Sequence, residues 1–453
     1  MLTILRRRTY RHLFAAQILS LIGTGLTTIA LGLLAYDLAG AEAGFVLGTA
    51  LAIKMVAYVG ISPFAGAVAG WLPRRGFLVT LDVIRAVMVL LLPFVTQVWQ
   101  IYLLVFLFQS CSAAFTPTFQ ATIPDILPQE RDYTSALSLS RLAYDLESLL
   151  SPLLAAALLT VIGFHWLFVG NAIGFLASGL LVLSVALPKV GAVQRSFLER
   201  LTRGTWIYLR TPRLRGLLAL SFAVAAAGAM VIVNTVVMVR EEFGGTDRDV
   251  AFFFAAYGAG SMIVALLLPR VLESLPPRMI MLAGALPLPI ILIAAALAPG
   301  YWATLFLWGV LGAGSSAVLT PAGILLRRSA QPEDRPALFA AQFALSHAGW
   351  LVTYPAAGWL GAAYGLNAAS LVLALAAAAG AIAAAIMWPR HDPDIIYHVH
   401  EPIEHRHPLE AGEHHAPPLV EPGLDASGRH KHRAIRHAHA FVIDDHHPLW
   451  PKS

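Results

Sequence analysis

Cysteine and charge are both scarce in this chain. A single cysteine, Cys111, occurs among 453 residues, which excludes a disulfide framework, a thiolate metal cage and a redox pair. Only 13% of the residues are charged, whereas soluble globular chains contain about 25%. The sequence also lacks a phosphate-binding glycine loop and a nucleophile elbow, so we expect neither an ATPase nor another enzyme, and no bound cofactor.

Apolar residues make up most of the chain. They account for 58% of the chain, and the mean hydropathy is +0.69. Such a composition is typical of a polytopic membrane protein surrounded by lipid. The net charge of +5 would suit nucleic acid, but the basic residues flank the apolar runs, so no nucleic acid partner is predicted.

Twelve apolar runs are long enough to cross a bilayer as helices, which takes about 20 residues each. The sequence therefore predicts an all-α protein of twelve transmembrane helices. The predicted spans lie near 13–36, 44–71, 77–96, 99–121, 134–161, 165–187, 214–239, 249–272, 279–298, 301–326, 336–362 and 366–388.

Basic residues are distributed unevenly among the loops between these spans. If the N-terminus is inside, the outer loops contain only Arg240 and Arg248. The inner loops then contain Arg6, Arg7, Arg8, Arg11, Arg74, Arg75, Arg131, the run from Lys189 to Arg215, Arg270, Arg278, Arg327, Arg328 and Arg335. This asymmetry predicts a multi-pass protein of the cell inner membrane with both termini in the cytoplasm.

The two halves of the chain share an internal repeat at an offset of 204 residues: Thr116-Pro117 recurs as Thr320-Pro321, and Arg131 as Arg335. Parallel repeats of six helices are typical of one large transporter class. We expect an N-terminal bundle, a cytoplasmic linker, a C-terminal bundle and a cytoplasmic tail. Their predicted ranges are 1–188, 189–213, 214–389 and 390–453.

Short motifs in and after the second, third and fourth predicted spans indicate a family. Pro73-Arg74-Arg75 follows the second span, Asp82-Val83-Ile84-Arg85 lies in the third, and Thr116-Pro117 leads to Pro124-Asp125-Ile126-Leu127-Pro128. Together with the two halves, these motifs resemble the major facilitator superfamily over residues 1–388, in its branch of small-molecule and siderophore exporters. The resemblance implies transport driven by an ion gradient, and we expect a monomer.

The predicted inner face departs from the family pattern in one place. Gly70-Trp71-Leu72 stands where the family usually has an Asp ahead of the basic residues. The ion relay that gates the inner face is therefore expected to be incomplete or rebuilt. Asp82 and Arg85, at i and i+3, predict an ion pair near this face, with a structural or a gating role.

The fifth span carries three charges at membrane depth, where one ionisable side chain costs roughly 2.5–3.5 kcal/mol on insertion scales. Arg141 and Asp145 stand four residues apart and can neutralise each other. Glu147 lies on another stripe of the helix, without a local cation. Lys54, at a similar depth in the second span, can pair with either acid. These residues form either a structural cluster or a site for proton and cation coupling.

His347 lies in the middle of the eleventh span, the repeat counterpart of the fifth. A single histidine in an apolar helix is either a core residue or a ligand. We predict a midplane metal site of Asp145, Glu147 and His347, with Lys54 and Arg141 taking part in transport and proton coupling.

Histidine is concentrated in the tail, where residues 391–453 contain thirteen of the sixteen in the chain. Neutral imidazole with carboxylates suits nickel, cobalt, zinc or copper(II). The tail lacks apolar periodicity, so we expect disorder without metal, and it is either metal-binding or merely solubilising. The predicted ligands are His398, His400, His405, His407, His414, His415, His430, His432, His437, His439, His446 and His447.

A histidine-rich end after twelve spans resembles the nickel-resistance exporters of the superfamily. The strings LRRRTYRHLFAAQILSLIGTGL and FTPTFQATIPDILPQERDYTSALSLSRLAYDLESLLSP support this resemblance. It implies proton-driven export of nickel, with cobalt as a second ion, which gives metal resistance. Two alternatives stay open: an exporter of a siderophore, drug or metal chelate, and a membrane metal sensor or store that transports nothing.

Overall fold

The chain divides into two compact units, Met1–Pro389 and Arg390–Ser453. The structure, a computed structural model, describes the greater part of the first unit and short stretches of the second. The described residues are 2–39, 43–69, 72–188, 196–297, 300–392, 395–400, 404–406, 429–431, 435–444, 447 and 449–451.

Six long helices form the N-terminal half of the first unit, preceded by the short 3-10 helix η1 (Leu2–Arg6). They are α1 (Arg8–Ala39), α2 (Ala43–Ala69), α3 (Arg74–Leu91) with its 3-10 extension η3 (Leu92–Phe94), α4 (Val98–Ile126), α5 (Glu130–Leu159) and α6 (His165–Leu183). Small residues allow close packing between them: a Cβ at Gly174 of α6 would lie 2.8 Å from the Leu19 carbonyl oxygen of α1.

The linker between the halves contains one amphipathic helix, α7 (Phe197–Arg210). It begins after Ser196, whose hydroxyl accepts a hydrogen bond from the Glu199 amide at 3.3 Å, as an N-cap does. It ends at Thr211, directly before Pro212 opens the next helix.

The C-terminal half repeats the six-helix pattern with more interruptions. Its first span runs from α8 (Pro212–Ala229) through the π-helical segments η4 (Met230–Asn234) and η5 (Met238–Glu242), with α9 (Thr235–Val237) between them. Proline lacks an N–H donor, and helix breaks accordingly fall at Pro287 and Pro321. The later helices are α10 (Asp247–Val271), α11 (Pro277–Ala285), α12 (Pro287–Ala296), α13 (Tyr301–Leu319), α14 (Ala322–Arg328), α15 (Arg335–Tyr364) and α16 (Leu366–Met387).

Ten helical segments among the described residues are long and apolar enough to cross a membrane. The remaining two of the twelve predicted spans are α5 and α15, each 30 residues long, which contain Arg141, Asp145 and Glu147 in one case and His347 in the other. The predicted all-α fold of two six-helix bundles is confirmed.

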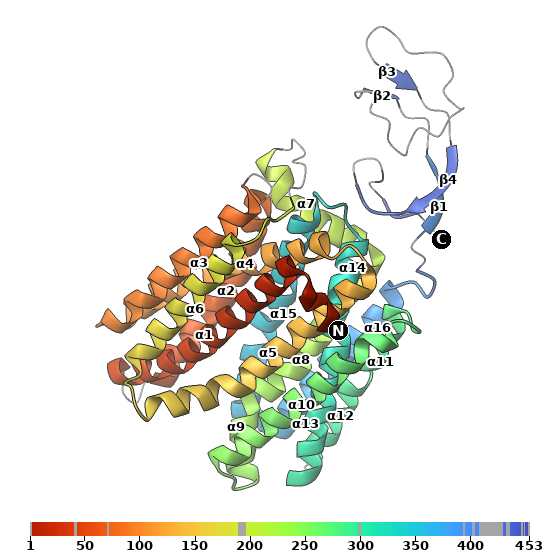
Figure 1. Ribbon diagram of the computed structural model, residues 1–453. Coiled ribbons are helices and arrows are strands. Elements are labelled where there is room, and N and C mark those ends of the chain that lie inside the picture. Colours follow the sequence, from red (N-terminus) through yellow and green to blue (C-terminus); the bar gives the residue numbers. More distant parts are fainter. Residues whose placement is uncertain are drawn as a thin grey trace. The chain divides into compact units, whose positions relative to one another are not determined.

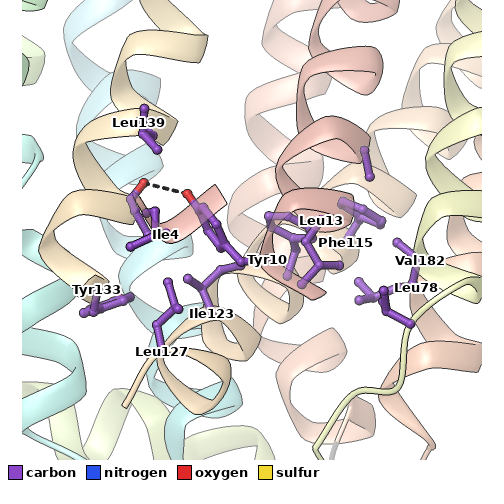
Figure 2. Close-up of a cluster of buried hydrophobic side chains, with 14 of the residues drawn as sticks. Ile4, Tyr10, Leu13, Leu78, Phe115, Ile123, Leu127, Tyr133, Leu139 and Val182 are labelled. Atoms are coloured by element: carbon purple, nitrogen blue, oxygen red, sulfur yellow. Dashed lines mark hydrogen bonds between the residues drawn. The ribbon is translucent and has the colours of Figure 1, made fainter. Parts of the chain in front are cut away.

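The two halves pack together along two pairs of helices, α2 with α15 and α5 with α10 (Figure 1). We call the end of the bundle that carries η1, α7 and the first turns of α5 and α15 the linker face. A buried apolar cluster lies there, and Ile324 of α14 extends it from the N-terminal half into the C-terminal half. Figure 2 shows its members Ile4, Tyr10, Leu13, Leu78, Phe115, Ile123, Leu127, Tyr133, Leu139 and Val182.

The second unit contains four short strands in two antiparallel pairs. Strand β1 (Ile395–His400) pairs with β4 (Ile435–Ala440), and β2 (Glu404–Arg406) pairs with β3 (Arg429–Lys431). Most of the tail for which the sequence predicts disorder lies outside the described residues, and so do the predicted ligands His407, His414, His415, His432 and His446.

Candidate transport site and gate

The ion pair predicted within α5 is present, and it also contacts the other half of the protein. Arg141 Nη2 lies 3.2 Å from Asp145 Oδ1, and Arg141 Nε donates to Ser261 Oγ of α10 at 2.9 Å. Asp145 is 6% exposed. Because a buried charge requires a partner, the pair is held at the contact of α5 with α10, where it links the two halves.

Glu147 occupies a different setting, on the side of α5 that faces α1. It lines a cavity of about 650 Å³ together with Ser151 and otherwise apolar residues. Gly25 of α1 makes room for it, because a Cβ there would lie 2.6 Å from Glu147 Oε1. The Lys54 ammonium of α2 interacts electrostatically with this carboxylate. Glu147 is thus an acid at a cavity rather than a member of a closed ion pair.

His347 of α15 packs among rings where the halves meet. Its ring centroid lies 4.9 Å from that of Tyr58 in α2 and 4.2 Å from that of Phe343, and its Nδ1 lies 2.7 Å from the Phe343 carbonyl oxygen. The Tyr58 hydroxyl donates to Gln109 Oε1 of α4 at 3.0 Å, and Lys54 Nζ lies 5.5 Å from the Tyr58 ring centroid. Lys54 and His347 therefore share one aromatic neighbour across the contact between the halves.

The predicted midplane metal site is not assembled in this conformation. Among the residues that the structure describes, no group of three or more histidine, cysteine or carboxylate side chains could hold one metal ion. Asp145 is paired with Arg141, Glu147 faces the cavity beside α1, and His347 packs against Tyr58 and Phe343. A metal bound by all three would need a rearrangement of α5 against α15.

The ion pair predicted in α3 is present and lies wholly within the N-terminal half. Arg85 pairs with Asp82, whose Oδ2 accepts a hydrogen bond from Ser178 Oγ of α6 at 2.9 Å. The Arg85 guanidinium also stacks on Phe115 and Phe175, 4.0 and 4.4 Å from their centroids. These contacts hold α3, α4 and α6 together.

Asp125, at the end of α4, joins the two halves at the linker face. Its Oδ2 lies 2.5 Å from Arg74 Nη1, and its Oδ1 pairs with Arg335 at the start of α15. The Asp125 side chain is 7% exposed and that of Arg74 8%. One buried carboxylate therefore connects the loop after α2 to the opposite half, through the Arg74 of the Pro-Arg-Arg motif.

Further polar contacts across the linker face surround Asp125. Arg328 Nη2 lies 2.6 Å from Glu130 Oε1, and Arg327 donates to the Pro128 carbonyl oxygen. Ser62 Oγ of α2 donates to the Ala340 carbonyl oxygen of α15 at 3.0 Å. With the apolar cluster beneath them, these contacts close the linker face.

The linker helix α7 is fastened to the start of α15. Arg203 lies 3.1 Å from Asp334 Oδ2, and a Cβ at Gly204 would overlap the backbone of Ala337. The Tyr208 hydroxyl donates to Gln342 Oε1, and burial raises the pKa of Tyr208 well above its usual value, so the donor keeps its proton.

Sequence reasoning did not single out Asp125, Asp334 or Arg203 as functional. A signal was available: the usual acid is missing at Gly70-Trp71-Leu72, while Asp125 stands in a recognised motif and Arg335 is the repeat counterpart of Arg131. Arg74, Asp125 and Arg335 form an ion-pair network at the face where the family's relay was expected to be incomplete or rebuilt.

Two six-helix halves with a polar seam between them and an ion-paired linker face are the architecture of a class of membrane transporters. A family model described as "transmembrane secretion effector" matches residues 1–332. The chain belongs to this family of the major facilitator superfamily. Its members are transporters, in agreement with the prediction that the chain is not an enzyme.

Known relatives are distant in sequence. An uncharacterized MFS-type transporter of Bacillus subtilis (strain 168), YfiS, is 23% identical over 269 residues, which are 57% of this chain and 63% of that protein. The match thus spans less than two thirds of that relative's length.

Solved structures show the same fold. The human organic anion transporter MFSD10 superimposes with a TM-score of 0.73 at 11% identity, covering 83% of this chain and 99% of that one. A bacterial homologue of the iron transporter ferroportin, in an outward-facing state, gives 0.69 at 13% identity, with 84% and 99% covered. The fucose:proton symporter of E. coli gives 0.66 at 16%, with 84% and 98% covered.

Proposed function

We propose that this transporter exports divalent transition-metal ions from the cytoplasm by proton antiport, with nickel as the main cargo and cobalt as a second one. The observation that carries the proposal is Glu147, a carboxylate at a cavity between α1 and α5, within the electrostatic reach of Lys54. The thirteen tail histidines support a metal as cargo. The family description of a secretion effector supports the outward direction.

In this scheme the conformation described above is the one closed toward the cytoplasm. A proton arriving from outside neutralises Glu147 and releases the cation. Separation of Asp125 from Arg335 then opens the linker face, and α5 and α15 rearrange so that Glu147, Asp145 and His347 approach a common ion. The incoming ion displaces the proton of Glu147 into the cytoplasm, which completes the exchange, and Lys54 repels a second cation. One of the structural neighbours is itself a homologue of an iron transporter.

The proposal is tested by metal accumulation in cells with and without the protein, compared for nickel, cobalt and zinc. Cells that express the protein should accumulate less nickel, and dissipation of the pH gradient should abolish the difference. Cells that express Glu147→Gln should accumulate as much nickel as cells without the protein, although the variant is still inserted in the membrane. Equal nickel accumulation in all three strains would refute metal export.

A second candidate is export of an organic cation or a metal chelate, which the apolar lining of the Glu147 cavity favours. Its walls include Phe14, Ile18, Leu21, Leu142, Leu146 and Leu150. A hydrated ion gains nothing from such a surface, whereas an amphipathic molecule buries apolar area there. This candidate predicts that free metal is not extruded from vesicles but that a lipophilic cation or chelate is, again with loss in Glu147→Gln.

A further inference from the structure

Tyr133 of α5 places an unbonded hydroxyl at the contact between the two halves. The residue is 1% exposed, and among the residues that the structure describes its Oη has no hydrogen-bond partner. Buried polar atoms of proteins are nearly always hydrogen-bonded, so an exception requires a physical reason. An atom of this kind makes the conformation that buries it less stable.

The side chain of Tyr133 meets α14 of the opposite half. A Cβ at Gly323 would lie only 2.6 Å from Tyr133 Oη and 2.7 Å from Leu137 Cδ2, so a glycine is needed there to leave room for the hydroxyl. The Arg327 guanidinium, also of α14, lies 5.6 Å from the centroid of the Tyr133 ring, within the range of a cation–π contact. The ring is thus covered from the C-terminal half, and separation of α14 from α5 uncovers the hydroxyl.

Two arginine nitrogens near Tyr133 are in a similar condition. Arg327 Nη1 and Arg335 Nε are buried and have no hydrogen-bond partner within the described part of the chain, although each side chain bonds through another of its nitrogens. Both guanidinium groups interact electrostatically with Tyr133. The closed linker face therefore combines strong ion pairs with several polar atoms that would be hydrogen-bonded in water.

We propose that the Tyr133 hydroxyl is a release element of the linker face: it makes the closed state less stable, and water hydrates it when α14 moves away from α5. The ion pairs of Asp125 hold the same face closed. A carrier has to pass between two conformations of comparable free energy, and an unbonded polar atom in the closed state offsets part of the stability that the ion pairs give it. The proposal rests on the opening and closing of the linker face in the proposed function, and not on the identity of the cargo.

Tyr133→Phe tests this role, because it removes the hydroxyl and keeps the ring with its contacts to Arg327 and to the apolar cluster. The reporter is Ile324→Cys in a Cys111→Ser background. Ile324 is 1% exposed, and the full-length protein in detergent is labelled with a dilute, water-soluble maleimide. When opening and closing are fast relative to labelling, the labelling rate follows the population of the open state.

We expect labelling of the reporter to be slower in Tyr133→Phe by roughly 5–30-fold, the factor that corresponds to removing the penalty of one unbonded buried polar group. The direction is opposite to that expected when an ion pair of the linker face is removed. A labelling rate equal to or faster than that of the reporter protein with Tyr133 would contradict the proposal.

Tyr10 of α1 provides the matched control. It is also 1% exposed and belongs to the same apolar cluster (Figure 2), but its hydroxyl donates to the Ala136 carbonyl oxygen of α5 at 3.5 Å. Donor and acceptor both lie in the N-terminal half, so opening of the linker face does not separate them. Tyr10→Phe should therefore leave the labelling rate close to that of the reporter protein. Equal slowing in both variants would mean that any hydroxyl lost from the cluster has this effect, and the proposal would fail.

A combined variant separates a shift of the gate from a general gain in stability. Asp125→Asn favours the open linker face and should label faster. Adding Tyr133→Phe should slow labelling again, because the penalty of the hydroxyl belongs to the closed state in either background. The two side chains interact electrostatically, so the factor can differ from that in the single variant. A combined variant that labels as fast as Asp125→Asn alone would overturn the role of the hydroxyl.

Labelling also distinguishes this proposal from the proposed function, since it requires neither metal nor a pH gradient. Slower labelling in Tyr133→Phe, with no nickel flux in any vesicle preparation, would support the release element and exclude metal export. Nickel export together with unchanged labelling would support metal export and exclude the release element.

Discussion

Helices α5 and α15 occupy corresponding places in the two halves, yet they bring different chemistry to the seam. Both contain 30 residues, and both begin in the ion-pair region of the linker face. The middle of α5 carries Arg141, Asp145 and Glu147, whereas the middle of α15 carries His347 among aromatic rings. The N-terminal half thus supplies the fixed charges, and the C-terminal half supplies an aromatic surface.

Under the proposed function, this difference lets a duplicated scaffold bind and release a cation. If both helices carried acids, closure of the halves would bury like charges on both sides of the seam. With charge on one helix and rings on the other, closure covers the acids without adding like charge. The comparison predicts that changes in α5 affect coupling and that changes in α15 affect cargo binding.

Glu147→Gln is expected to have the largest effect. The variant keeps the size of the side chain but cannot exchange a proton, so pH-driven export should fall to the level of cells without the protein. Nickel efflux from everted vesicles measures this loss. Glu199→Gln, on the surface of α7, serves as the control and should transport normally. Retained pH-driven efflux in Glu147→Gln would assign the carboxylate a structural role.

Asp125→Asn should have the second-largest effect, because it leaves two arginines at the buried end of α4 without their carboxylate. Removing one partner of a buried ion pair costs about 3–5 kcal/mol. Here that loss destabilises the closed state relative to the open one. We expect faster labelling of Ile324→Cys, which lies in the sealed cluster of the linker face. Asp132→Asn removes an ion pair to Arg7 that is exposed and internal to one half, so it should leave the labelling rate unchanged.

His347→Phe should have an intermediate effect. The ring contacts with Tyr58 and Phe343 are kept, but the imidazole nitrogens are lost. If the histidine is a cargo ligand, the apparent affinity for nickel should fall by about tenfold while the maximal rate changes little. Phe343→Leu controls for ring packing alone. An unchanged affinity for nickel in His347→Phe would show that the histidine contributes only to aromatic packing.

Ser261→Ala should have the smallest effect, since it removes the hydroxyl that bonds to both Arg141 and Asp145 but leaves the ion pair between these two residues. A single hydrogen bond to a charged group contributes about 1.5–3 kcal/mol at most. A modest decrease in thermal stability in detergent is expected, with transport retained. Ser110→Ala, whose hydroxyl bonds within its own helix, is the matched control. Equal melting temperatures for both variants would show that this contact does not join the halves energetically.

The helices could be predicted from the sequence because membrane spans depend on local composition. The predicted spans 165–187 and 366–388 correspond within a few residues to α6 and α16. The i, i+4 pair of Arg141 with Asp145 is also local, and it is present. Such contacts follow from helix geometry alone.

Contacts between distant segments could not be predicted in the same way. The partners of Asp125 are Arg74 and Arg335, and only the packing of the two halves brings them together. Sequence spacing likewise placed Glu147 and His347 at similar depth, but it did not reveal that one faces α1 while the other lies against Tyr58. The direction in which a helical side chain points can be related to function only when the neighbouring helices are known.

The attachment of α7 to α15 has a practical consequence for dividing the protein. A chain break ahead of Ser196 would leave α7 covalently joined to the second half and still held there by Arg203 with Asp334 and by Tyr208 with Gln342. Fragments 1–188 and 196–453, produced separately, should therefore reassociate into a working carrier. A break between Arg210 and Pro212 would instead leave α7 on the N-terminal fragment, without its covalent link to the second half.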